Sequence, residues 1–191
     1  MINGWRFFFS FSSNINYFDS NNIKSSRYLT YSNKFYDIYL AYRNEGLFLY
    51  VDIKKKVEII NNDFIELFFD TRNLKSLYYL DKYCHHFVFF FEKEEDHFVK
   101  EVTKFRGDNL HLHADPTDIF VKVKKTRNNY SYDMCIPQKC LYGFDPEKFT
   151  NIGFAFRINS FEKTKKIGIP FADVEVERQR NLWHTLKMNW G

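Results

Sequence analysis

One short segment constrains the fold of this chain more than any other. In FIELFFD, residues 64–70, the side chains alternate between two sets, one of which contains Glu66 and Asp70. A period of two is typical of a half-buried β-strand, because successive side chains of a strand point to opposite faces. The two carboxylates are therefore predicted to share one face of a strand, and the other face supplies three apolar side chains to a core: Ile65, Leu67 and Phe69.

Similar alternating segments recur along the chain and are joined by short polar connections, as in β-hairpins. Strands are expected at residues 5–13, 36–43, 47–53, 85–91, 97–104, 119–126, 130–136, 151–159 and 182–188. The first hairpin is expected to turn at Asn44, Glu45 and Gly46, and Pro137 is placed to open a short helix or 3₁₀ turn near 137–148. Because no helices alternate with the strands, the sequence predicts an all-β fold, a single antiparallel β-sandwich of the jelly-roll or immunoglobulin-like kind.

Length and composition agree with one all-β domain. The chain has 191 residues, of which 45% are hydrophobic, and Phe (23) and Tyr (13) outnumber Gly (7) and Pro (4). A chain of this size can bury one proper core, and aromatic residues favour strands. We therefore expect one domain over residues 1–191, with an N-terminal strand and loop at 1–35 and the main sandwich at 36–190.

Charge and cysteine content bear on the partners of the chain. The formal net charge is +4 and basic residues are interspersed with acids, so no nucleic-acid partner is predicted. Cys84, Cys135 and Cys140 have no CxxC spacing, which favours incidental thiols over a disulfide framework or a zinc site, and Cys84 is expected to be buried. No apolar run approaches the ~20 residues that cross a bilayer. We therefore expect no membrane partner and, by default, a cytoplasmic location.

The order of these segments resembles that of the carbohydrate-binding module family 9-like, or DOMON-like, β-sandwich domains. The most recognisable strand of that family has the pattern D-[ST]-[IVL]-E-[IVLF]-F-[IVLF]-D. This chain has Phe64 in place of the usual small residue and matches the pattern at Asp63, Ile65, Glu66, Phe68 and Asp70. The resemblance covers most of residues 36–190. It implies a noncatalytic jelly-roll-like sandwich that binds sugars or, in some branches, haem; some members hold a structural calcium, and no other cofactor is predicted here.

A sugar-binding module needs flat exposed rings that stack on the sugar and planar polar side chains that bond its hydroxyl groups. The candidate ligand-binding residues are Trp183, Trp190 and Tyr79 as rings, with Arg72, Glu66, Asp70 and Arg157 as polar groups. We therefore interpret the chain as a noncatalytic carbohydrate-binding-like module whose partner is a saccharide or a similar polar ligand. The alternative is a structural or protein-interaction sandwich that has lost the sugar site and binds another protein. A small glycoside hydrolase is a third hypothesis.

The spacing of Glu66 and Asp70 is evidence against a catalytic pair. At ~3.3 Å per residue their α-carbons lie roughly 13 Å apart along a strand, whereas the carboxyl groups of a glycosidase lie about 5 to 9.5 Å apart. A polar row on a solvated or half-covered sheet face is the simpler interpretation. Alternatively, one acid of this segment, Asp63 included, forms an ion pair with Arg72, Arg106 or Arg157.

Histidines form a second candidate site. In a strand, His111 and His113 would share a face and Asp115 would extend the row, a spacing that suits a metal ion. The adjacent His85 and His86 would point to opposite faces, so at most one of them could join. No HExxH or cysteine motif accompanies these residues, so ordinary hydrogen-bonded histidines are the favoured interpretation.

Overall fold

A computed structural model of the 191-residue chain describes residues 29–32, 36–54, 64–75, 79–126, 129–159, 167–169, 176–177 and 179–188. The strand expected at 5–13 lies outside these residues, as do Asp63 and Trp190. No helix in the described ranges has the length and apolar character that a membrane span requires.

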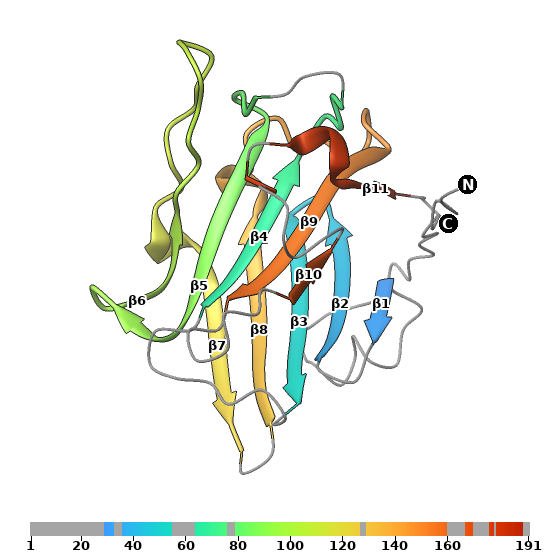
Figure 1. Ribbon diagram of the computed structural model, residues 1–191. Coiled ribbons are helices and arrows are strands. Elements are labelled where there is room, and N and C mark those ends of the chain that lie inside the picture. Colours follow the sequence, from blue (N-terminus) through green and yellow to red (C-terminus); the bar gives the residue numbers. More distant parts are fainter. Residues whose placement is uncertain are drawn as a thin grey trace.

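The described strands form two antiparallel sheets that face each other, as Figure 1 shows. The first sheet has the order β1 (Leu29–Ser32), β2 (Tyr36–Arg43), β3 (Gly46–Lys54), β8 (Asn129–Pro137) and β7 (Phe120–Lys125). The second has the order β10 (Ile167–Ile169), β9 (Asn151–Asn159), β4 (Phe64–Asp70), β5 (Cys84–Glu94) and β6 (His97–Glu101), and β11 (His184–Lys187) also pairs with β9. The only helices in the described ranges are three 3₁₀ turns: η1 (Pro116–Asp118), η2 (Gln138–Cys140) and η3 (Arg180–Leu182). This architecture confirms the predicted antiparallel β-sandwich.

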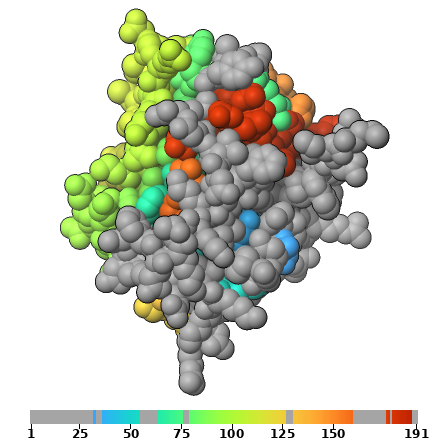
Figure 2. Space-filling view, in the orientation of Figure 1, coloured from blue at the N-terminus to red at the C-terminus, as the bar shows by residue number. Residues whose placement is uncertain are grey.

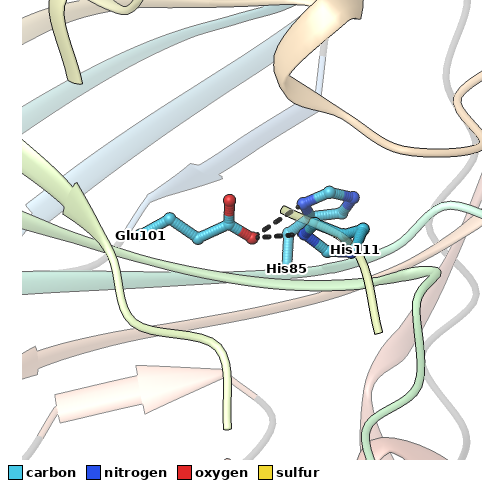
Figure 3. A group of neighbouring side chains, drawn as sticks. All are labelled: His85, Glu101 and His111. Carbon is cyan, nitrogen blue, oxygen red and sulfur yellow. Dashed lines mark hydrogen bonds and ion pairs between the residues drawn. The ribbon is translucent and has the colours of Figure 1, made fainter. Parts of the chain in front are cut away.

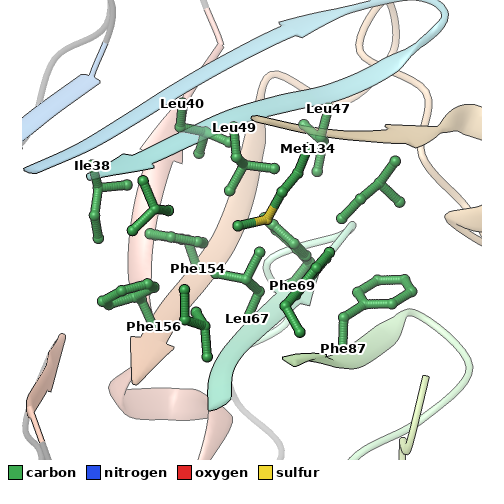
Figure 4. Close-up of a cluster of buried hydrophobic side chains, with 14 of the residues drawn as sticks. Ile38, Leu40, Leu47, Leu49, Leu67, Phe69, Phe87, Met134, Phe154 and Phe156 are labelled. Atoms are coloured by element: carbon green, nitrogen blue, oxygen red, sulfur yellow. The ribbon is translucent and has the colours of Figure 1, made fainter. Parts of the chain in front are cut away.

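The main core lies between the two sheets, where alternate residues of facing strands meet (Figure 4). Ile65, Leu67 and Phe69 of β4 have no exposed surface and contribute to it, as the alternation predicts. Leu49 of β3 and Met134 of β8 are also fully buried in this core. Burial of such side chains stabilises the fold by about 1.5–3 kcal/mol each.

The outer face of β4 is also buried, which corrects the expected solvated polar row. A second, smaller apolar cluster covers this face and contains Phe68, Leu80, Cys84, Ala155, Val176 and Trp183. Val176 and Trp183 belong to the C-terminal segment, which packs on the sheet from outside. The polar residues of the row, Glu66 and Asp70, are 4% and 1% exposed. The alternation therefore separates two buried surfaces rather than one buried and one wet surface.

The hairpin between β2 and β3 turns at two residues, Asn44 and Glu45, and not at three. Gly46 already belongs to β3, where it pairs with Arg43 on one side and with Pro137 on the other. Its φ of +148° suits glycine, and a Cβ there would collide with the carbonyl oxygen of Ile136. The glycine is therefore needed for the close approach of the β8 backbone and not for the turn.

Candidate functional site

Glu66 is the centre of a polar cluster on the outer face of the second sheet. The strand register places it directly beside Arg157 of β9. The Arg157 guanidinium donates to both carboxylate oxygens, with Nη2 2.8 Å from Oε1. The Asn159 side-chain amide donates to Oε2, and His86 Nε2 lies 2.9 Å from Oε1. This arrangement confirms the ion pair between Glu66 and Arg157, one of the alternatives that the sequence left open.

Two members of this polar cluster (Glu66, His86, Arg157, Asn159 and Glu177) stabilise each other's charge, namely Glu66 and Arg157. Burial by itself would raise the pKa of Glu66, but hydrogen bonds from His86 and Arg157 outweigh it and lower the pKa to about 2. Burial would lower the pKa of Arg157, but the hydrogen bond and charge of Glu66 raise it. Arg157 Nη1 also donates to Glu177 over 3.0 Å, and the Glu177 side chain is 34% exposed. The polar cluster therefore reaches the surface at Glu177.

Aromatic rings pack against the polar cluster. The His86 ring stacks on Phe68 with centroids 4.2 Å apart, and the Arg157 guanidinium lies 5.8 Å from the same ring. Trp183 packs on Phe68 from another side, with centroids 5.6 Å apart, and its Nε1 donates to the carbonyl oxygen of Val176. Because Trp183 has no exposed surface, its ring offers no face to a sugar. Trp183 therefore packs behind the polar cluster. This corrects its predicted role as a ring that stacks on the sugar.

Asp70 belongs to a separate, buried group at the end of β4. Its carboxylate accepts hydrogen bonds from the backbone N–H groups of Arg72 and Leu74, over 3.0 and 2.7 Å, and so stabilises the turn after the strand. The fully buried Arg180 side chain lies 3.6 Å from Asp70 and donates twice to the carbonyl oxygen of Leu74. Figure 2 shows the red surface of residues 179–188 beside the green residues of this turn. The contacts of Asp70 therefore stabilise the turn after β4 and its packing against Arg180.

The buried group also contains Asp81 and Cys84. Arg180 Nη1 lies 2.9 Å from the carboxylate of Asp81 and 2.9 Å from the sulfur of Cys84. Burial raises the pKa of the Cys84 thiol to about 12, and it raises the pKa of Asp70 as well. A thiol with such a pKa is a poor nucleophile at neutral pH. The structure confirms that Cys84 is buried.

A surface with exposed rings lies where the loops after β4 and η2 meet, and we call it the aromatic loop end (Arg72, Tyr83, Tyr142 and Phe149). The Arg72 guanidinium lies 3.3 Å from the centroid of the Phe149 ring, and the Tyr83 and Tyr142 rings are 5.7 Å apart. Tyr79, Tyr142 and Phe149 are 37%, 46% and 37% exposed. Arg72 Nη1 is buried and has no hydrogen-bond partner within the described ranges. Of the predicted site residues, Arg72 therefore belongs to this surface, and Tyr79 is exposed in the same loop after β4.

The three candidate metal ligands of the sequence, His111, His113 and Asp115, do not come together in the structure. Residues 102–115 form no strand, so their side chains do not alternate between two faces. His113 Nε2 lies 3.0 Å from the carbonyl oxygen of Thr103, and Asp115 accepts hydrogen bonds from Thr117 at the start of η1. Of the predicted row, only His111 points into a group of possible ligands.

That group consists of His85, Glu101 and His111, and within the described ranges it is the one set of three or more His, Cys, Asp or Glu side chains close enough to share an ion. Calcium takes six to eight oxygen ligands. This group offers one carboxylate and two imidazoles, so its donors do not fit the calcium ion that the family resemblance implies.

Sequence reasoning did not place three residues in the polar cluster: His86, Asn159 and Glu177. Asn159 follows Arg157 by two positions in a segment predicted to be a strand, so the shared face could have been found from spacing. His86 and Glu177 reach the polar cluster from β5 and from the C-terminal segment, and no sequence pattern links those segments to β4.

The sequence matches no protein-family model, and no curated protein shows a significant match. Among solved structures, the chain is similar to a carbohydrate-binding module family 9 (CBM9) domain from Caldicellulosiruptor kristjanssonii in complex with glucose. The two structures have a TM-score of 0.70 and 12% sequence identity, and the match covers 97% of this chain and 96% of the other.

A second solved structure gives the same result. A CBM9 domain from the same organism, in complex with cellotriose, has a TM-score of 0.64 and 16% identity over 96% of this chain and 93% of the other. The chain therefore has a CBM9-like fold, which confirms the fold that the order of the sequence segments implies.

Proposed function

We propose that this chain is a noncatalytic carbohydrate-binding module and that its saccharide binds where the polar cluster reaches the surface, at Glu177. The observation that carries the proposal is the convergence of four planar polar side chains behind this position: Glu66, His86, Arg157 and Asn159. These four are only 4–8% exposed, so the Glu177 carboxylate, which Arg157 holds in place, is the group that meets the saccharide. A planar carboxylate can bond two neighbouring hydroxyl groups of a sugar at once. Because the four side chains already hold one another in place, little ordering entropy is lost when a ligand binds.

The similar solved structures indicate which ligands should be tested first. Two domains with the same fold are complexes with glucose and with cellotriose. Glucose and glucose-based oligosaccharides are therefore the first candidates for this chain.

The state of the carboxylates supports a noncatalytic role. A glycosidase needs one carboxylic acid with a raised pKa that can give a proton to the leaving group. Glu66 has a pKa of about 2 and is fully paired, so it carries no proton to donate at neutral pH. Asp70 is 1% exposed and bonded to its own turn and to Arg180. Neither predicted acid has the environment of a catalytic group.

A pair of alanine variants tests where the saccharide binds. Glu177→Ala removes the exposed carboxylate of the polar cluster while Glu66 keeps its bonds to Arg157 and His86. Arg72→Ala is the matched control, because it removes a polar side chain from the aromatic loop end. We expect calorimetry with cellotriose to show binding by the wild type and unchanged binding by Arg72→Ala. Glu177→Ala should bind at least about tenfold more weakly, which corresponds to the loss of one good hydrogen bond.

The opposite pattern, with Arg72→Ala weakened and Glu177→Ala unchanged, would move the saccharide to the aromatic loop end. If the folded wild type binds no saccharide on a glycan array, the proposal fails and a protein-interaction sandwich becomes the better explanation.

A further inference from the structure

His85, Glu101 and His111 meet as Figure 3 shows, on the core-facing side of β5 and β6 and beside Phe87 of the main core. His85 comes from β5, Glu101 ends β6, and His111 comes from the loop that follows β6. Glu101 Oε1 lies 3.0 Å from His85 Nδ1 and 2.9 Å from His111 Nε2. The side chains of His85 and Glu101 have no exposed surface, and that of His111 is 4% exposed. The group is therefore fully interior.

The second ring nitrogen of each histidine faces a backbone carbonyl. His111 Nδ1 lies 2.7 Å from the oxygen of Lys82, and His85 Nε2 lies 3.4 Å from the oxygen of Tyr142. A carbonyl oxygen carries no proton, so the hydrogen of each of these contacts belongs to the imidazole. A neutral ring that donates there presents the lone pair of its other nitrogen to Glu101. Three lone pairs then converge on one place, and such an arrangement is favourable only if a cation or additional protons lie between them.

The carboxylate of Glu101 is held in position for such a role. Its Oε2 accepts a hydrogen bond of 2.7 Å from the backbone N–H of Ala114, and its Oε1 accepts one of 2.8 Å from the hydroxyl of Thr103. The group therefore contains a buried carboxylate that two hydrogen bonds from its own surroundings hold in place.

These contacts match the surroundings of metal-bound histidines, which almost always donate their other N–H group to a carbonyl or a carboxylate. Two imidazoles and one carboxylate suit zinc, whose bonds of about 2.0–2.2 Å place neighbouring tetrahedral ligands roughly 3.4 Å apart. The three ligand atoms lie within 4.8 Å of one another. A small outward movement of the side chains would accommodate the ion.

We propose that His85, Glu101 and His111 form a binding site for a divalent transition-metal ion of the zinc class. The ion would connect the loop that carries His111 to β5 and β6. This site is separate from the polar cluster around Glu66, because Glu101 and Phe87 are cross-strand neighbours on the core side of β5 and β6. Its role is structural, and its existence does not depend on sugar binding.

The first test is a titration of metal-free wild-type protein with ZnCl₂, followed by calorimetry. We expect one zinc ion per chain, and we expect CaCl₂ to give no heat from this site. At zinc concentrations about 100 times the dissociation constant, the melting temperature should rise by roughly 5 to 10 °C. Because this test needs no variant, a wild type that takes up no zinc overturns the proposal and leaves protons as the cations that hold the group together.

The second test assigns the site to these residues. Glu101→Gln keeps the shape of the side chain and removes its charge, so it should abolish the zinc-dependent rise in melting temperature. His113→Gln is the matched control, because His113 is close in sequence to His111 but bonds to the carbonyl oxygen of Thr103. It should keep the full rise. Zinc uptake that survives in a folded Glu101→Gln variant, or that is lost in His113→Gln, would place the ion elsewhere and contradict the assignment.

Discussion

Replacing Glu66 by alanine is expected to lower the free energy of unfolding by about 3 kcal/mol, because removing one partner of a buried ion pair leaves the other charge poorly compensated. Arg157 would keep only Glu177, and Asn159 and His86 would each lose an acceptor. For a domain of this size the loss corresponds to a fall in melting temperature of roughly 10 °C. Urea unfolding followed by fluorescence measures the free energy, and a thermal scan measures the temperature.

A surface ion pair provides the control for this prediction. Asp118 pairs with Lys139, whose side chain is 64% exposed. Asp118→Ala should change the free energy of unfolding by less than about 1 kcal/mol. If Glu66→Ala costs no more than Asp118→Ala, the polar cluster does not form as described.

Replacing Trp183 by alanine is expected to cost about 3–5 kcal/mol of stability, since the ring is completely buried and its removal leaves a large cavity beneath the C-terminal segment. The variant also loses the contact with Phe68 and the hydrogen bond to the carbonyl of Val176. Leu112→Ala is the control, because Leu112 is 91% exposed and its truncation should change stability by less than about 0.5 kcal/mol. Urea unfolding of the three proteins provides the comparison.

Saccharide binding by the same variant separates a structural role from a ligand-binding one. In the structural account, Trp183→Ala binds cellotriose with normal affinity in whatever fraction of the protein remains folded. A Trp183→Ala protein that is as stable as the wild type but no longer binds would restore this ring as a ligand contact.

The sandwich itself could be predicted from sequence because strand alternation and turn residues are local signals. FIELFFD and NIGFAFRIN each produced strands close to the expected bounds, β4 at Phe64–Asp70 and β9 at Asn151–Asn159. Alternation reports which side chains share a face, but it does not report what covers that face. The burial of Glu66 depends mainly on residues about 90 to 120 positions later in the chain, and no local pattern carries that information.

The candidate sites were predictable only in part for the same reason. The pair of Glu66 and Arg157 was one of the alternatives, because both lie in predicted strands, but the choice among the arginines required the strand order. For the group of His85, Glu101 and His111, the sequence offered His111 and allowed one of His85 and His86 to join it. Glu101 could not be predicted, because the group joins two neighbouring strands to a loop without regular structure. Trp183 was assigned to the ligand because ring composition alone does not distinguish a buried ring from an exposed one.

The central claim is that a saccharide binds at the polar cluster, and an NMR titration of ¹⁵N-labelled protein with cellotriose tests it most directly. The side-chain N–H resonances of Arg157, which donates to Glu177, and of Asn159 in the same polar cluster report on a ligand bound there. We predict that these resonances shift in a saturable way as cellotriose is added, while the Arg72 side-chain resonance stays in place. Resonances of Arg157 and Asn159 that do not move while that of Arg72 shifts would contradict the account.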